Sequence, residues 1–120
     1  MCRHCAAERY AGAEFQGRET GNADFVCESE ETLLAQLREL VLMLPFNQED
    51  VLDYDVCEDD LNRKIADYSG TGDAAQILKD ITDAGRYVEV TAGYVREMVT
   101  AFVKLNGLTV GAVANRTEIL

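Results

Sequence analysis

Two apolar segments meet at the dipeptide Asn106-Gly107, and this junction constrains the fold more than any other feature of the sequence. It predicts a β-hairpin with a two-residue type I′ turn, because both turn positions need a positive φ that Asn tolerates and Gly adopts freely. The predicted strands are 98–105 and 108–114. The turn predicts three apolar pairs, which are Leu105 with Leu108, Val103 with Val110 and Ala101 with Ala112. The face that carries these pairs is entirely apolar, so another element must cover it.

A helix is predicted to begin at Ser29 and to end before Pro45. Ser29 is a good N-cap residue, and the acidic Glu30 and Glu31 suit the positive end of the helix dipole. The apolar residues follow helical spacing and form one stripe: Leu33, Leu34, Leu37, Leu40, Val41 and Leu44. Burial of each such side chain contributes roughly 1.5–3 kcal/mol, so we expect this helix to dock on a surface.

A second helix is predicted from Asp73 to about Thr82. Asp73 and Gln76 have the spacing of a capping box, and Gly85 stands where a left-handed C-cap is expected. A strand at 87–90 follows.

The remaining segments carry weaker patterns. Residues 1–22 have no clear period and are predicted to form a weakly ordered arm. Residues 46–60 are acidic and irregular, which suits a linker, and residues 60–66 are predicted to form a short helix. Together the elements predict an α+β chain in which helices precede a β-hairpin.

Composition limits the partners. The chain has 120 residues, which is a one-domain length, and 11 basic against 22 acidic residues give a net charge of −11. Such a surface is a poor partner for nucleic acid, because contacts with phosphate groups need Lys and Arg. No stretch is apolar enough to insert into a membrane, and no signal peptide is visible, so a cytoplasmic location is expected.

The most suggestive metal motif is Cys2-Arg3-His4-Cys5. A structural zinc site needs four thiolate or imidazole ligands, usually from two paired knuckles. Only one pair is present, since Cys27 and Cys57 are solitary. The pattern therefore favours incidental cysteines over a zinc site, and we assign no metal ligand.

The acidic stretch at 49–60 raises calcium as another alternative. An EF-hand loop that begins at Asp53 needs an oxygen ligand at its fifth position and glycine at its sixth, where Cys57 and Glu58 stand. A solvated linker is the favoured interpretation. The residue patterns assign no catalytic residue.

Several short sequence motifs of this chain also occur together in one known family. They are residues 40–45, 59–63, 86–90 and 98–102, then Leu105-Asn106-Gly107-Leu108-Thr109-Val110-Gly111 and Val113-Ala114-Asn115-Arg116. In order and spacing they resemble the opening of the second carboxyltransferase domain in biotin-dependent acyl-CoA carboxylases and the related sodium-pump decarboxylases. Those chains include propionyl-CoA carboxylase β subunits and methylmalonyl-CoA decarboxylase α subunits. The resemblance runs from about residue 21 to residue 120, which is only part of a family member.

The resemblance implies a fold and a division of the chain. The implied fold is the crotonase-like (ClpP/crotonase) spiral of ββα units, of which this chain is expected to be a fragment. Residues 1–22 would be the arm, residues 23–66 an interdomain helix and acidic linker, and residues 67–120 the start of the second carboxyltransferase domain.

The resemblance also implies an activity for the parent protein. A carboxyl group would move between biotin on a partner and an acyl-CoA, with paired backbone N–H groups stabilising the enolate and ureido oxyanions. The glycine-rich segments that supply those groups lie outside the matched region, so this chain is expected to bind neither cofactor and to be inactive alone. Asn115 and Arg116, in the loop after the second strand, are the residues expected near the substrate crevice.

Several alternatives stay open at this point. The chain is expected to be part of a carboxyltransferase that pairs with the remainder of that subunit and with a biotin carrier protein. It would alternatively be a free-standing, non-enzymatic assembly or binding module, or a complete small binding domain. Exposed strand edges predict self-association of the purified chain. The sequence does not identify the acyl-CoA, and it does not distinguish a carboxylase from a decarboxylase.

Overall fold

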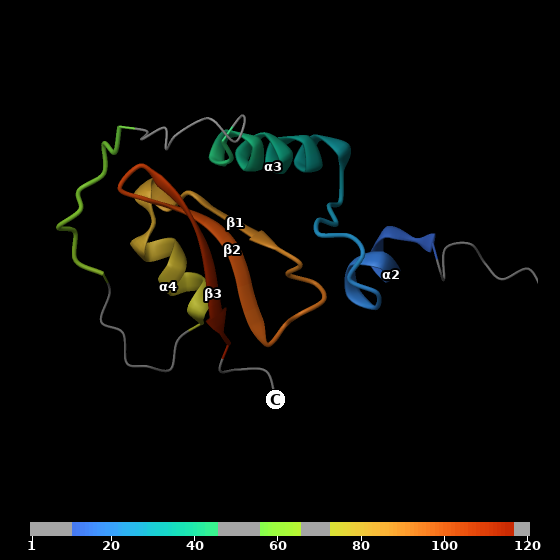
Figure 1. Ribbon diagram of the computed structural model, residues 1–120. Helices are drawn as coiled ribbons and strands as arrows, with labels where there is room; N and C mark the ends of the chain where they lie inside the picture. Colours follow the sequence, from blue (N-terminus) through green and yellow to red (C-terminus); the bar gives the residue numbers. More distant parts are fainter. Residues whose placement is uncertain (1–10, 46–55, 66–72, 117–120) are drawn as a thin grey trace, which may run out of the picture.

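The computed structural model describes residues 11–45, 56–65 and 73–116, and its centre is an antiparallel sheet (Figure 1). The sheet has three strands in the order β1-β2-β3, which are β1 (Tyr87–Val90), β2 (Met98–Leu105) and β3 (Leu108–Asn115). Asn106 and Gly107 have φ angles of 51° and 80°, as a type I′ turn requires. Leu105 lies opposite Leu108, so the predicted hairpin and its register are confirmed.

Helix α4 (Ala74–Ile81) covers one face of the sheet. The core between them is small and consists of short side chains: Ala74, Ala75, Val99, Ala101 and Val103. Asp73 caps α4 as predicted, since its Oδ1 accepts the N–H of Ala75 at 3.1 Å. The amide of Gln76 turns to Asp80 and donates at 2.8 Å, so the predicted capping box is not completed.

The end of α4 differs from the prediction. The helix ends at Ile81, Thr82 is extended, and a short 3₁₀ turn, η1 (Asp83–Gly85), follows. Gly85 is left-handed with φ of 71°, but it closes η1 rather than α4, and Ala84 before it is also left-handed with φ of 49°. The expected C-cap at Gly85 is therefore wrong in its role.

Residues 60–63 form a turn and residues 64–65 are irregular, in place of the short helix predicted for 60–66, and residue 66 lies outside the described residues. The N–H of Arg63 donates to the carbonyl of Asp60 at 3.0 Å. The guanidinium of Arg63 then reaches the end of α4, where it donates to the carbonyls of Asp80 at 3.0 Å and Thr82 at 2.6 Å. These contacts hold the turn against the helix and satisfy carbonyls that a helix end leaves free.

Helix α3 (Glu30–Met43) begins at its N-cap Ser29, as predicted, and meets the face of the sheet opposite α4. The hydroxyl of Thr109 donates to the carbonyl of Met43. Thr109 alternates along β3 with Val110, which pairs with the core residue Val103, so Thr109 points away from the α4 face. A helix thus lies on each face of the sheet.

A short helix, α2 (Ala13–Arg18), lies within the segment expected to be weakly ordered, whose residues 1–10 are outside the described part. It packs against the connection between β1 and β2 at a close approach of two glycines. A Cβ added at Gly93 would lie 3.3 Å from the carbonyl oxygen of Gly17. Neither α2 nor any other helix in the described part of the chain is long and apolar enough to cross a membrane.

Candidate functional site

The guanidinium of Arg116 joins three elements at one end of the sheet. Its Nη2 lies 2.7 Å from Oε1 of Glu89 on β1, and its Nε lies 3.2 Å from Oδ1 of Asp73 at the start of α4. The backbone N–H of Arg116 also donates to the carbonyl of Glu97 at 2.8 Å. The side chains of Arg116 and Glu89 are only 17% and 14% exposed, so the pair is partly shielded from water.

Tyr87 completes this cluster from the same face of β1 as Glu89. Its hydroxyl donates to Oε2 of Glu89 at 2.6 Å, and the ammonium of Lys79 lies 5.1 Å from the centroid of its ring. Burial, followed by the neighbouring carboxylate of Glu89, raises the pKa of Tyr87 above its usual range. Burial opposes the charge of Arg116, but Glu89 and Asp73 outweigh it and raise the pKa of that guanidinium.

The cluster holds the chain at the end of β3. The guanidinium of Arg116 forms ion pairs with two carboxylates, so it acts as a clamp between β3, β1 and α4. Asn115, the neighbouring residue expected near substrate, is exposed at the last position of β3. Sequence reasoning missed Tyr87 and Glu89 as partners of Arg116, although their spacing of two on a predicted strand placed both on one face.

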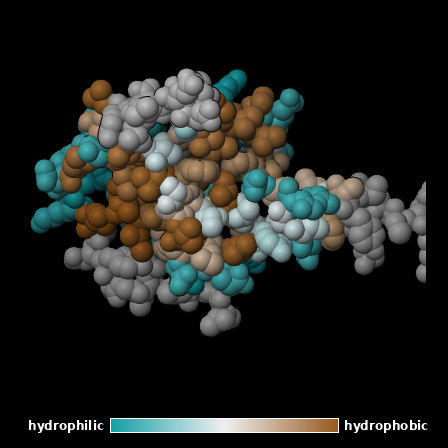
Figure 2. Space-filling model, in the orientation of Figure 1, coloured by the Kyte–Doolittle hydropathy of each residue, from teal (hydrophilic) through white to brown (hydrophobic). Residues whose placement is uncertain are grey.

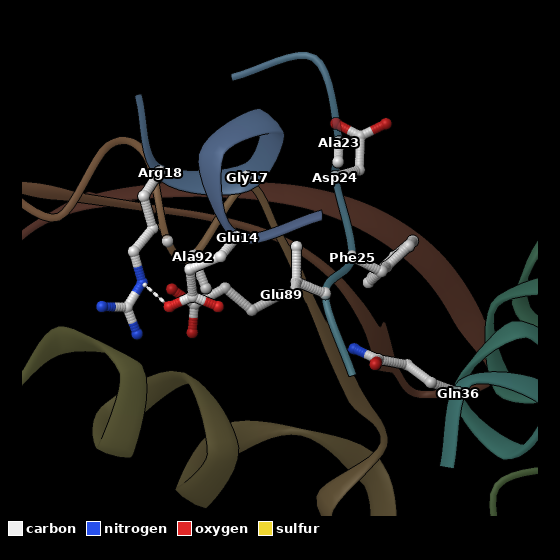
Figure 3. A pocket seen from close by; sticks show the side chains of 11 residues that line it. Glu14, Gly17, Arg18, Ala23, Asp24, Phe25, Gln36, Glu89 and Ala92 are labelled. Atoms are coloured by element: carbon white, nitrogen blue, oxygen red, sulfur yellow. Dashed lines mark ion pairs between the residues drawn. The ribbon is translucent and has the colours of Figure 1, made fainter. Parts of the chain in front are cut away.

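A pocket of about 180 Å³ lies between α2, the extended segment after it, α3 and the end of β1 (Figure 3). Its described lining is Glu14, Gly17, Arg18, Ala23, Asp24, Phe25, Val26, Gln36, Glu89, Ala92 and Gly93. Arg18 and Glu14 form an ion pair at 2.9 Å, but both side chains are 67% exposed, so the pair contributes little. Three carboxylates against one guanidinium make this an unsuitable cradle for phosphate groups.

Thr91 lies between Glu89 and Ala92, two residues that line this pocket. It is a β-branched residue with a left-handed φ of 55°, a conformation that such residues rarely adopt. Its N–H donates to the carbonyl of Asp24 at 3.2 Å, and its hydroxyl donates to the carbonyl of Val90 at 2.7 Å. Its own carbonyl accepts the N–H of Tyr94 at 3.0 Å. These bonds stabilise the strained residue and join the N-terminal segment to the β1–β2 connection.

A second pocket, of about 310 Å³, lies beside the β2–β3 turn. Its described lining is Val56, Cys57, Glu58, Asp59, Asp83, Ala84, Arg86, Lys104 and Gly107. The carboxylate of Asp83 accepts two backbone N–H groups of the turn, and the buried Lys104 donates to the carbonyl of Gly107 at 3.5 Å. The side chains of Asp83 and Lys104 are therefore bonded to the turn that borders the pocket.

The cysteines that the structure describes are free thiols. Cys27 donates to Oε1 of Gln36 at 3.2 Å, and Cys57 lies in the wall of the second pocket. Within residues 11–45, 56–65 and 73–116, no cluster of three or more His, Cys, Asp or Glu side chains is arranged to hold a metal ion. The Cys2-Arg3-His4-Cys5 motif and Asp53 lie outside the described residues.

Comparison with known proteins supports the resemblance drawn from the sequence. The chain is 32% identical over 121 residues to the methylmalonyl-CoA carboxyltransferase 12S subunit of Propionibacterium freudenreichii subsp. shermanii, which covers 95% of this chain and 23% of that subunit. It is 30% identical over 123 residues to the propionyl-CoA carboxylase beta chain of Roseobacter denitrificans, covering 96% of this chain and 24% of the relative. It is 26% identical over 122 residues to the methylmalonyl-CoA decarboxylase subunit alpha of Propionigenium modestum, covering 95% and 24%.

A solved structure extends the agreement to the fold. The transcarboxylase 12S crystal structure, with methylmalonyl-coenzyme A and methylmalonic acid bound, is similar to this chain with a TM-score of 0.80 at 31% identity. The similarity covers 94% of this chain and 23% of that one, and it defines the class as crotonase-like carboxyltransferases. The family match is to the carboxyl transferase domain over residues 1–120, and the chain belongs to that family. It spans about a quarter of the length of the relatives it matches, and it corresponds to part of a carboxyltransferase subunit.

Proposed function

We propose that this chain works as part of the carboxyltransferase subunit of a biotin-dependent acyl-CoA carboxylase or decarboxylase. The parent would transfer a carboxyl group between biotin on a partner and an acyl-CoA. The observation that carries the proposal is the family match over residues 1–120, supported by the TM-score of 0.80 to a transcarboxylase subunit at 31% identity.

The role of this chain within the parent is structural. Its described polar clusters hold secondary structure together: Arg116 holds the end of β3, and Asp83 holds the β2–β3 turn. The groups that would stabilise the oxyanions are expected in the rest of the parent. The isolated chain is therefore expected to bind no cofactor and to transfer no carboxyl group.

The loop after β3 is proposed to border the acyl-CoA crevice of the assembled enzyme. Arg116 would act as a positioning residue, because Glu89 and Asp73 hold its guanidinium, while the exposed Asn115 beside it would approach the substrate. In the assembled enzyme, Asn115→Ala is expected to raise the KM for acyl-CoA and to leave kcat nearly unchanged. A change in kcat alone would contradict this assignment.

The proposed partners are the remainder of the carboxyltransferase subunit and a biotin carrier protein, in the cytoplasm. The similar transcarboxylase 12S forms a hexamer in a multienzyme core, which supports assembly with further subunits. Self-association of the purified chain through its strand edges stays a prediction, which a monomer stable on size-exclusion chromatography at low concentration would contradict.

The experiment that tests the proposal is a blot of native extract from the source cells, with an antibody raised to this chain and streptavidin in parallel. We expect an antibody-reactive band much larger than 13.3 kDa that co-purifies with a biotinylated protein, with or without a further companion subunit. A lone band near 13.3 kDa without biotin would contradict the proposal and favour the free-standing binding module.

A further inference from the structure

The apolar stripe of α3 is wider than the surface that the sheet offers to it. Met43 is 2% exposed, and its carbonyl contacts the hydroxyl of Thr109 on β3. Five stripe residues stay exposed, which are Leu33 (40%), Leu34 (41%), Leu37 (46%), Val41 (50%) and Leu44 (38%). We call these five residues the outer stripe. Figure 2 shows hydrophobic side chains gathered over the region of α3 in the upper part of the view.

The outer stripe is not the solvent side of an ordinary amphipathic helix. At about 3.6 residues per turn, its four helical members fall on one side of α3, next to the edge that meets the sheet, and the extended Leu44 follows them as the C-cap. The charged residues Glu31, Arg38 and Glu39 lie on a different side, where Leu42 is also 57% exposed, so that side is mostly but not wholly polar. A contiguous exposed apolar surface beside a polar one is typical of an interface.

Two kinds of occupant would cover the outer stripe. A second copy of this chain would bring two bodies of net charge −11 together, and α3 itself carries Glu30, Glu31 and Glu39 against a single Arg38. The other occupant is the rest of a carboxyltransferase subunit. The transcarboxylase 12S structure matches this chain over only 23% of its own length, so about three quarters of such a subunit is available to cover α3.

We propose that the outer stripe of α3 docks on an apolar surface in the remaining part of the carboxyltransferase subunit. This inference rests on the proposed function and names the surface through which the chain joins its parent. Docking would bury the outer stripe, and it would leave the side with Arg38 and Glu39 in water.

The test uses the full chain with an affinity tag in native extract of the source cells. The variant Leu34→Gln/Leu37→Gln makes the centre of the outer stripe polar, and Arg38→Gln/Glu39→Gln introduces the same two residues on the polar side with no change in net charge. Mass spectrometry measures the recovery of carboxyltransferase peptides that lie outside the quarter matching this chain. Circular dichroism of each purified variant establishes that α3 and the sheet still form.

Recovery is expected to fall by about tenfold or more for Leu34→Gln/Leu37→Gln. For the control variant it is expected to stay within about twofold of the recovery by the unsubstituted chain. Equal recovery by all three, with a biotinylated protein still present, would overturn the docking surface and leave the proposed function standing. Recovery of untagged copies of this chain alone, separated from the tagged chain by mass, would identify a second copy as the occupant and overturn the inference. Recovery by none, with no biotinylated protein, would overturn the proposed function and the inference with it.

Discussion

The carboxylate of Asp83 accepts the backbone N–H of Gly107 at 2.7 Å. It also accepts the N–H of Asn106 at 2.9 Å, so one side chain holds both central residues of the type I′ turn. Asp83 lies directly after α4 and is only 8% exposed. The position of the hairpin is therefore set at the turn by a residue of η1, the 3₁₀ turn that follows the helix covering its core face.

Asp83→Ala is expected to destabilise the chain by about 1–3 kcal/mol, because the buried N–H of Gly107 and the part-buried N–H of Asn106 lose their acceptor. Urea unfolding followed by circular dichroism measures the change in the free energy of unfolding. The matched control is Asp80→Ala, which removes a carboxylate bonded to the exposed Gln76 and should cost about 0.5 kcal/mol or less. Equal losses in the two variants would show that the contact with the turn has no special weight.

The elements that the sequence predicted correctly depend on neighbours in the chain. The Asn106-Gly107 turn and the cap at Asp73 are set by local backbone preferences, so their residues indicate them directly. The cap that Arg63 provides to α4 spans 17 to 19 positions, and the pair of Arg116 with Glu89 spans 27. No periodicity reports such contacts. Resemblance identified the family, but the clamp at the end of β3 became visible only in the structure.

The pair of Arg116 and Glu89 is expected to show a coupling energy of about 1–2 kcal/mol. Both side chains are mostly shielded, so removing one leaves the other partly desolvated without its closest partner. The measurement is a double-mutant cycle of Arg116→Gln and Glu89→Gln, read from urea unfolding. Glu97→Gln, an exposed carboxylate nearby, serves as the control. Losses for Arg116→Gln and Glu89→Gln that add to within about 0.3 kcal/mol would mean that the ion pair does not act as a clamp.

Asp59 is expected to make the stability of the chain sensitive to acid. Its carboxylate accepts the N–H of Ala84 at 2.8 Å and pairs with Arg63, and these contacts outweigh burial and lower the pKa of Asp59 below its usual 3.8. Because the folded pKa is the lower one, the stabilisation is complete above about pH 4 and is lost as the pH falls through the folded pKa.

The measurement for Asp59 is the free energy of unfolding of the unsubstituted chain and of Asp59→Asn at pH 7, 4 and 3. The difference between the two should be largest at pH 7 and should shrink in acid. Glu58→Gln, which removes an exposed charge from the same stretch and keeps the contacts of Asp59, provides the comparison. A difference that stays constant from pH 7 to pH 3 would contradict the assigned direction.

Gly17→Ala is expected to loosen the contact between α2 and the segment that follows it. A Cβ at this position would lie 2.4 Å from Cγ2 of Val26. Because valine is stiff at χ1, the clash is expected to disturb the packing between α2 and Val26. Overpacking costs about 1–3 kcal/mol, which exceeds the gain of about 1 kcal/mol from replacing glycine by alanine inside a helix. The N–H of Ala23, which donates to the carbonyl of Gln16 at 3.1 Å, should then exchange with deuterium several times faster. Adding Val26→Ala removes the clashing methyl groups and should restore slow exchange, whereas slower exchange in Gly17→Ala alone would mean that Val26 rotates away and helix propensity decides.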